Sequence, residues 1–256
     1  LDQPYGIALS RDAASMYICD TGTERILVTP MAAPNASAFA SGVATPTSLA
    51  VSESALYVSQ YQKSVIRKYV PPSADVVMLI GADGSPGSAD GDHATARFTQ
   101  PRCLHYDEPS GYLYVADTHA GRVRTVAPNG VTATLDLGLT TAAMLYTLTM
   151  SPSGAMYIND QTTAKRHIYV FNAPPRIPAL SVTIGNGGIG FVDGVNPTTE
   201  VGGVRGIQLD AFTGDMLLAS KEHFRVARLS PDGRVTTWVG SGANAYTEGA
   251  GVAAEF

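Results

Sequence analysis

The chain is poor in the residues that mark several common protein classes. Only 2 of its 256 residues are cysteines, Cys19 and Cys103, and they stand in unlike sequence contexts, so we expect two buried thiols and no disulfide. Charged residues make up 15% of the chain, below the ~25% typical of soluble domains. No run of 18 apolar residues occurs, which excludes a helical membrane span within this segment.

Basic residues are also scarce. The chain has 17 Lys and Arg against 22 Asp and Glu, a formal net charge of −5. Because phosphate binding needs a concentrated basic face, this balance argues against a nucleic-acid partner. No signal peptide is visible, and the chain opens at Leu1, without Met, inside a repeated phrase. We therefore expect a piece of a longer protein.

What the chain does contain is a phrase that it repeats. Residues 2–28 and 98–126 both hold Gln-Pro, an apolar strand, a polar turn, a Tyr-centred strand, Asp-Thr and then Arg. Such self-similarity is the mark of stacked supersecondary units. Five copies can be aligned, with first strands at 6–10, 48–52, 103–107, 147–151 and 206–210.

Each copy continues into three more short strands. Turns with Asn-Gly or Asp-Gly, such as those at 128–130 and 231–233, are strong hairpin signals. Four short antiparallel strands per unit predict an all-β fold, a β-propeller with four-stranded blades. We predict one domain over 1–256, with repeats at about 1–39, 40–83, 84–136, 137–185 and 186–256.

A second, glycine-rich phrase joins the repeats, at 81–98, 185–201 and 240–256. In the first it ends Ala-Arg-Phe and leads into Thr-Gln-Pro, which opens the next unit. In the last it ends Ala-Glu-Phe at Phe256, while the chain begins Leu-Asp-Gln-Pro. The two ends thus run in register, which fits a five-bladed ring or a sixth blade outside the sequence.

Together the two phrases resemble NHL repeats. The matching residues are 3–8, 17–21 and 25–26 in the first repeat, 114–118 and 122–123 in the third, and 90–91 with 96–98 in the linker. Repeats two, four and five depart from the pattern. The resemblance implies a propeller that is usually six-bladed. It also implies a family that includes interaction modules, RNA binders, and amidating lyases and lactonases with channel zinc or calcium.

Two Asp–Arg pairs recur five residues apart, across the loop from the second to the third strand. They are Asp20 with Arg25 and Asp117 with Arg122. A charge-assisted hydrogen bond within each pair would pin this loop, so we interpret all four residues as structural. Loops that lose the pair are better candidates for contacts with a partner. The predicted binding residues are Gln60, His119, Arg166, Lys221, His223 and Arg225.

Residues that could carry catalysis do not form a recognisable motif. The five histidines show no HxH or HExxH spacing, and neither a GxSxG nucleophile nor a phosphate loop is present. First strands end in Ser or Asp, which suits turns, and the two carboxylates among them make a poor calcium site. If a metal is held, the candidates are His105, Asp107 and Asp210.

These observations favour a non-catalytic propeller, an interaction or structural module for a protein or glycan partner, with no cofactor. The alternative is a metal-dependent hydrolase or lyase of the amidating-lyase or lactonase type, with calcium or zinc in the central channel. The sequon at Asn35 points to an extracellular or cell-surface location. The sequence is compatible with a homo-oligomer and with flanking domains as further partners.

Overall fold

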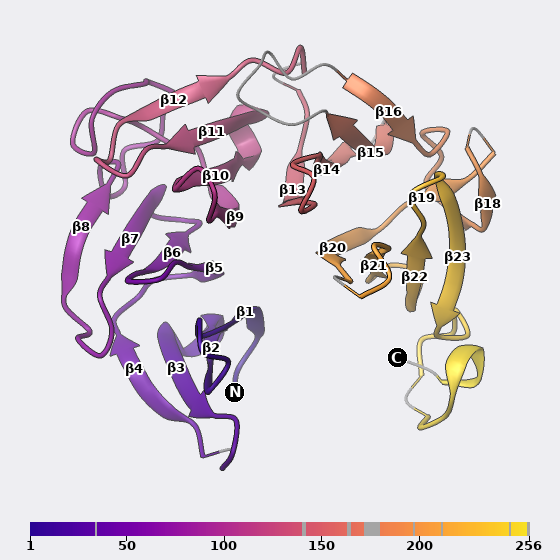
Figure 1. Cartoon of the computed structure of the whole chain (residues 1–256), viewed down its shortest axis with the longest axis horizontal. Helices are drawn as coiled ribbons and strands as arrows, with labels where there is room; N and C mark the ends of the chain where they lie inside the picture. The colour runs from indigo at the N-terminus through magenta and orange to yellow at the C-terminus, as the bar shows by residue number, and fades with distance from the viewer. Residues whose placement is uncertain are drawn as a thin grey trace. The chain divides into compact units, whose positions relative to one another are not determined.

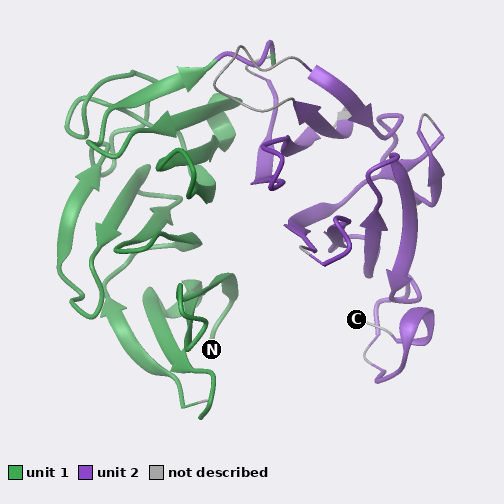
Figure 2. Cartoon of the chain, viewed as in Figure 1, with its two compact units in different colours: residues 1–135, 139–141 green, residues 136–138, 142–256 purple. Residues whose placement is uncertain are grey.

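The computed structural model describes residues 1–33, 35–139, 142–162, 165–171, 180–196, 198–210, 212–245 and 247–254. Over these residues the chain is all-β apart from three short 3-10 helices, as predicted. It divides into two compact units (Figure 2). Unit 1 is Leu1–Leu135 with Leu139–Thr141, and unit 2 is Asp136–Gly138 with Ala142–Phe256.

Unit 1 contains three four-stranded antiparallel sheets, each with its strands in chain order (Figure 1). Blade 1 consists of β1 (Pro4–Leu9), β2 (Ser15–Asp20), β3 (Arg25–Pro30) and β4 (Ser37–Ser41). Blade 2 consists of β5 (Pro46–Val51), β6 (Leu56–Gln60), β7 (Val65–Tyr69) and β8 (Val76–Ile80). Blade 3 consists of β9 (Pro101–Asp107), β10 (Tyr112–Asp117), β11 (Arg122–Val126) and β12 (Thr132–Leu135).

Unit 2 contains two more sheets of the same kind. Blade 4 consists of β13 (Leu145–Met150), β14 (Met156–Thr162), β15 (Lys165–Phe171) and β16 (Leu180–Ile184). Blade 5 consists of β20 (Val204–Leu209), β21 (Met216–Ser220), β22 (Arg225–Leu229) and β23 (Arg234–Val239), with β18 (Gly194–Val195) added outside β23. The linker strands β17 (Phe191–Val192) and β19 (Glu200–Val201) pair with each other. The five predicted repeats therefore correspond to five blades of a β-propeller fold.

Apolar residues on both faces of the blades form the cores. Tyr17 and Ile26 of blade 1 pack with Leu56 and Val58 of blade 2, and a second cluster joins blades 2 and 3. In unit 2 a third cluster joins blades 4 and 5. Because neighbouring blades cover both faces of a sheet, strands such as β6 are buried at every position. This burial explains why the strands read as apolar runs instead of clean alternation.

The residue at or just after the end of each first strand closes the turn that follows. Each accepts a hydrogen bond from a nearby backbone N–H, as the turn interpretation predicts. The pairs are Ser10 with Ser15 at 2.9 Å, Ser52 with Ala55 at 3.0 Å, Asp107 with Ser110 at 3.2 Å, Ser151 with Ala155 at 3.0 Å and Asp210 with Phe212 at 2.9 Å. These oxygens stabilise the backbone of the blades.

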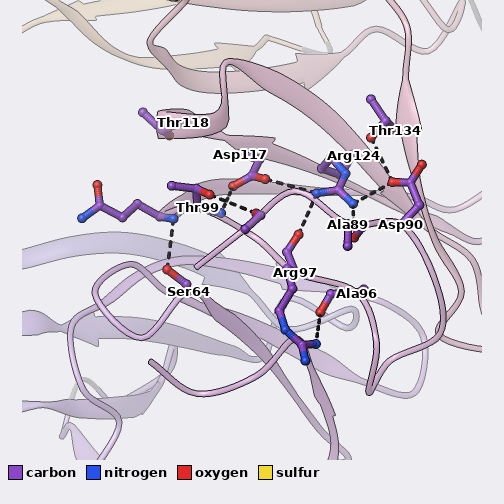
Figure 3. Close-up of polar contacts among 12 residues, drawn as sticks. Ser64, Ala89, Asp90, Ala96, Arg97, Thr99, Asp117, Thr118, Arg124 and Thr134 are labelled. Carbon is purple, nitrogen blue, oxygen red and sulfur yellow. Dashed lines mark hydrogen bonds and ion pairs between the residues drawn. The ribbon is translucent and has the colours of Figure 1, made fainter. Parts of the chain in front are cut away.

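The glycine-rich linker before blade 3 is fastened by one arginine. Arg124 of β11 is fully buried, and Figure 3 shows its guanidinium among four oxygens. It donates to the carbonyls of Ala89 and Arg97 at 2.8 Å each, to Asp90 Oδ1 at 2.7 Å and to Asp117 Oδ2 at 3.3 Å. The linker is thereby held to the blade that follows it.

This contact corrects the predicted pairing of Asp117 with Arg122. Arg122 and Arg124 lie two residues apart on β11 and so project from the same face. Linker residues Ala89, Asp90 and Arg97 bind Arg124. The buried carboxylate of Asp117 accepts from Arg124 and not from Arg122. The equivalent position in blade 1 is Leu27, opposite Ile18 as Arg124 is opposite Val115, and there Asp20 pairs with Arg25 at 3.1 Å, as predicted.

Both cysteines are free thiols, so the expectation of no disulfide is confirmed. Cys19 is buried, whereas Cys103 is only partly so. In the described part of the chain we find no helix with the length and apolar character that crossing a membrane requires.

Candidate functional site

A β-bulge interrupts the first strand pair of every blade at the same place. The register slips just after the first residue of each first strand, which leaves one residue or two outside the ladder. Bulges of this kind re-aim side chains and are common beside functional sites. The residue that follows the paired one in each blade, here called the bulge residue, is Tyr5, Thr47, Arg102, Tyr146 or Arg205.

In unit 1 the bulge residues of blades 1 and 3 meet a tyrosine from blade 2. The guanidinium of Arg102 lies 5.0 Å from the ring centre of Tyr5 and 5.3 Å from that of Tyr61, in cation–π geometry. The Tyr61 hydroxyl lies 3.1 Å from Nε2 of His119, and the two rings meet edge-on at 5.9 Å. We call Tyr5, Tyr61, Arg102 and His119 the unit 1 cluster.

The unit 1 cluster is open to solvent. Tyr5 is 48% exposed and His119 is exposed, while Tyr61 and Arg102 are half-buried. Its members come from two bulges and from the turns that follow the second strands of blades 2 and 3. The cluster therefore offers aromatic faces, a hydroxyl and a permanent positive charge on one surface.

A related arrangement stands in unit 2. Arg205 lies 4.2 Å from the ring centre of Tyr146, and its Nη2 donates to Glu222 Oε1 at 2.7 Å. Arg166 forms an ion pair with the other carboxylate oxygen of Glu222. The hydrogen bond from Arg166 is the main cause that lowers the pKa of Glu222, and the charge of Arg205 adds to it. We call Tyr146, Arg166, Arg205 and Glu222 the unit 2 cluster.

The second-strand residue that pairs with the first residue of each first strand ties the segment that precedes the bulge. In three blades an aspartate accepts from a backbone N–H: Asp20 from Asp2 at 2.6 Å, Asp117 from Thr99 at 2.6 Å and Asp160 from Met144 at 3.0 Å. In the other two the direction is reversed: Gln60 donates to the carbonyl of Ala44 and Ser220 to that of Gly202, each at 2.9 Å. All five blades thus keep the tie, although the sequence pattern varies.

These ties correct part of the predicted binding set. Gln60 is fully buried and bound to Ala44, so its side chain supports the blade and does not meet a partner at the surface. The loops of blades 2 and 5 are therefore not loosened by the loss of aspartate. Two other residues of the predicted binding set belong to the clusters defined above. His119 lies in the unit 1 cluster and Arg166 in the unit 2 cluster.

Three more predicted residues lie in blade 5, Lys221 and His223 in the turn after β21 and Arg225 at the start of β22. Lys221 is exposed. His223 is half-buried, with Nδ1 at 3.1 Å from both Ser220 Oγ and the carbonyl oxygen of Gly202. Arg225 donates to the carbonyl of Ser241 at 3.5 Å. Asn35, the predicted glycosylation site, is exposed just before β4.

The predicted metal ligands belong to different units, His105 and Asp107 to unit 1 and Asp210 to unit 2. His105 and Asp107 lie on β9 in unit 1, where burial lowers the pKa of His105. Asp107 and Asp210 each accept hydrogen bonds inside their own turns. Within the ranges that the structure describes, no three His, Cys, Asp or Glu side chains are grouped so as to hold a metal ion.

The two equivalent aspartates have opposite pKa shifts. The Thr23 hydroxyl, the Asp2 N–H and Arg25 lower the pKa of Asp20. Burial raises the pKa of Asp117 to about 6, although Thr99 and Arg124 stabilise its charged form. Desolvation by burial is the largest cause for Asp117, whereas hydrogen bonds are the largest causes for Asp20, although both side chains are covered from solvent.

Sequence reasoning did not single out the bulge residues, Tyr61 or Glu222. A signal was present, because the bulge residue directly follows the proline of the Gln-Pro phrase in blades 1 and 3. Aligning the five copies at that column gives Tyr, Thr, Arg, Tyr and Arg. Glu222 stands two positions after the tie residue of its blade, in the column that holds His119 in blade 3.

Solved structures show the same fold at low sequence identity. An auxiliary nutrient binding protein from Bacteroides thetaiotaomicron matches with a TM-score of 0.74 and 15% identity, over 95% of this chain and 59% of its own. Virginiamycin B lyase from Staphylococcus aureus matches with 0.63 and 12%, over 92% and 69%. A chain of the nidogen–laminin complex matches with 0.64 and 12%, over 92% and 80%.

No protein-family model matches the chain, and no curated protein matches it. The solved structures therefore show the β-propeller fold alone, and the NHL assignment stays a prediction. This chain spans 59% to 80% of the lengths of those three propeller chains.

Proposed function

We propose that the chain is a non-catalytic, NHL-type recognition propeller that binds a protein partner through the unit 1 cluster. The observation that carries the proposal is the bulge at one place in every blade, which in unit 1 brings Tyr5 and Arg102 beside Tyr61. Tyr and Arg are the residues enriched at the centres of protein interfaces, where a few side chains supply most of the affinity.

The scaffold around the cluster suits recognition. Propeller loops held by a rigid sheet present a fixed surface, which lowers the entropy lost on binding. The ties from Asp20, Gln60 and Asp117 hold the bulges and turns of unit 1 in place. Propellers of the same fold include a nutrient-binding protein and a chain in a complex with laminin, so this scaffold is compatible with a binding role.

The exposed sequon at Asn35 agrees with an extracellular or cell-surface location for such a module. The hydrolase or lyase alternative has the fold of virginiamycin B lyase in its favour, which is analogy at the level of fold. Of the residues suggested for it, Asp107 and Asp210 each accept a hydrogen bond inside their own turn, which is a structural role. We therefore place recognition first.

Site-specific crosslinking tests the proposal. A photo-reactive benzoylphenylalanine replaces exposed Gln62, next to Tyr61, or exposed Ser54, in the turn at the other end of blade 2. In extract from the native source, we expect one covalent adduct from position 62 and not from position 54. Tyr61→Ala should abolish the adduct, while Arg11→Ala at the far end of blade 1 should not. An adduct that forms equally at both positions would contradict the proposal.

A further inference from the structure

The outer strand of blade 2 resembles outer strands that the chain covers elsewhere with its own linkers. We propose that the outer edge of β8 receives an extended segment of a partner protein, which pairs with β8 and places an Asp or Glu side chain on Arg67. This surface uses no residue of the unit 1 cluster, so the proposal does not depend on the proposed function.

Blade 3 shows the completed arrangement within unit 1. Gly91 of the linker forms an antiparallel β-bridge with Thr132 of β12, the outer strand of that blade. Asp90, just before this glycine, accepts from the Thr134 hydroxyl at 2.9 Å and from Arg124 at 2.7 Å. The linker thus adds a short strand segment and a carboxylate to the edge of the sheet.

Blade 5 repeats the strand segment and its acidic residue. Gly194 of β18 pairs antiparallel with Val235 of β23, and the preceding Asp193 accepts from the Thr237 hydroxyl at 2.8 Å. An Asp-Gly segment therefore covers the outer strand in both blades that follow a long linker.

Blade 2 has the outer strand without such a linker. Only residues 42–45 lead from β4 of blade 1 to β5 of blade 2. β8 is the last strand of its sheet (Figure 1), and no strand of the described residues pairs with its outer edge. Val76, Val77 and Leu79 are 41%, 53% and 36% exposed. Charge or proline usually blocks an open edge, and β8 has neither, so it suits pairing with another chain.

Arg67 occupies in blade 2 the position that Arg124 occupies in blade 3. Both are the central residue of the third strand, Arg67 opposite Leu79 and Arg124 opposite Thr134. In blade 3 this position lies within reach of a carboxylate on the segment outside the fourth strand. The same reach is expected of Arg67 toward a segment outside β8.

Arg67 does not have the acidic partner that Arg124 has. It is half-buried, and among the residues that the structure describes it forms no ion pair. It lies near the hydroxyl of Tyr69, a neutral group: burial raises the pKa of Tyr69, and Arg67 lowers it in part. Because a charged hydrogen bond is stronger than a neutral one, a carboxylate at this edge would be the better partner.

Blades 3 and 5 also indicate the register. Val76 pairs with the last residue of β7, as Thr132 and Val235 pair with the last residues of β11 and β22. The partner residue that follows the acidic one should therefore lie opposite Val76, and the acidic side chain should lie beside Leu79. Leu79 has no hydroxyl, so the partner segment lacks the contact that Thr134 gives to Asp90.

A peptide copied from the linker tests the proposal. The probe is residues 86–95 of the chain, blocked at both ends, and the control peptide carries Asp90→Asn. Each is titrated into the whole chain, and the backbone NMR signals of β8 and the Arg67 guanidinium signal are followed. We expect saturable millimolar binding of the probe at β8, and binding of the control that is about tenfold weaker or more.

Variants of blade 2 separate the contacts. Arg67→Gln should weaken the probe about tenfold or more, because a charged hydrogen bond is lost. Lys68→Gln, on the opposite face of β7, should change it about twofold or less. Leu79→Thr should strengthen it about fivefold, because it adds the hydroxyl that the linker meets in blade 3.

Four outcomes would overturn the proposal. Two are equal binding of the Asp90→Asn peptide and unchanged binding with Arg67→Gln. If Arg67→Gln does not fold, the absence of any gain with Leu79→Thr is the deciding result. Equal binding of N-acetyl-aspartate N-methylamide, which is too short to add a strand, would leave an anion contact alone. Shifts of the β8 signals with protein concentration, without peptide, would assign the edge to a second copy of the chain.

Discussion

At the scale of single residues, the tie position shows how one role survives different side chains. Asp20, Gln60 and Ser220 all bind the backbone ahead of the bulge, the first by accepting and the other two by donating. Since a tie needs only a matched donor and acceptor, the side chain is free to change if its backbone partner changes with it. The surroundings of the tie residue still differ between blades, because the pKa of Asp20 is lowered whereas that of Asp117 is raised.

The raised pKa of Asp117 predicts an unusual pH dependence of stability. Its folded pKa is about 6 against 3.8 for the unfolded chain, so the folded state binds the proton more tightly. Stability linked to this group therefore rises as the pH falls from above 6 to about 4. At 1.36 kcal/mol per pH unit, wild type should gain roughly 2 kcal/mol over Asp117→Asn between pH 7 and 4. Urea unfolding at several pH values measures this gain.

Asp20→Asn is the matched control for that experiment. The pKa of Asp20 is lowered in the folded state, so its contribution is present above the unfolded value of 3.8 and is lost below it. The difference between wild type and Asp20→Asn should then stay flat from pH 7 to about 4 and decline at lower pH. If the stability difference between wild type and Asp117→Asn stayed flat across this pH range, folding would not raise the pKa of Asp117, and the prediction would be wrong.

At the scale of elements, the linker and the blade that follows it behave as one piece. Gly91 forms an isolated β-bridge with Thr132 of β12, and Asp90 accepts from the Thr134 hydroxyl at 2.9 Å. In blade 5 the linker residue Asp193 accepts in the same way from the Thr237 hydroxyl at 2.8 Å. The equivalent position holds Arg67 in blade 2, where it is only half-buried, and Ala227 in blade 5.

Arg124→Met should destabilise the chain far more than loss of the arginine in blade 1. The substitution removes four contacts and leaves the Asp117 carboxylate buried without its partner, which typically costs about 3–5 kcal/mol. Arg25 is 41% exposed, so Arg25→Met should cost about 1 kcal/mol or less. Urea unfolding compares the two, and amide exchange over 81–98 should quicken only in the first. Equal costs would contradict the burial argument.

The elements themselves were predictable, whereas the site was not. Strands and turns follow local chemistry, and the predicted hairpin at 128–130 forms with Gly130 at a φ of +85°, where glycine is favoured. The choice between Arg122 and Arg124 depends on a linker more than 20 residues away, which no local pattern specifies. The bulges are likewise a property of strand pairing, so the sequence marks the column of the residue after proline, but that residue's role follows only from the sheet.

At the scale of the whole molecule, stability comes from cores shared by neighbouring blades. One core joins blades 1 and 2, another blades 2 and 3, and a third blades 4 and 5. In repeat architectures each unit draws its stability mainly from adjacent units. Damage to one core should therefore be felt first in the two blades that build it.

Two leucines allow this expectation to be tested. Leu56 of blade 2 and Leu218 of blade 5 are both fully buried, so replacing either with alanine should cost about 2–5 kcal/mol. Leu218→Ala should quicken amide exchange in β13–β16 and β20–β23, because its core includes Ile168 and Ile184 of blade 4. Leu56→Ala should do so in β1–β8. Exchange that quickens equally in all five blades with either variant would instead show one cooperative unit, in which no blade responds before the others.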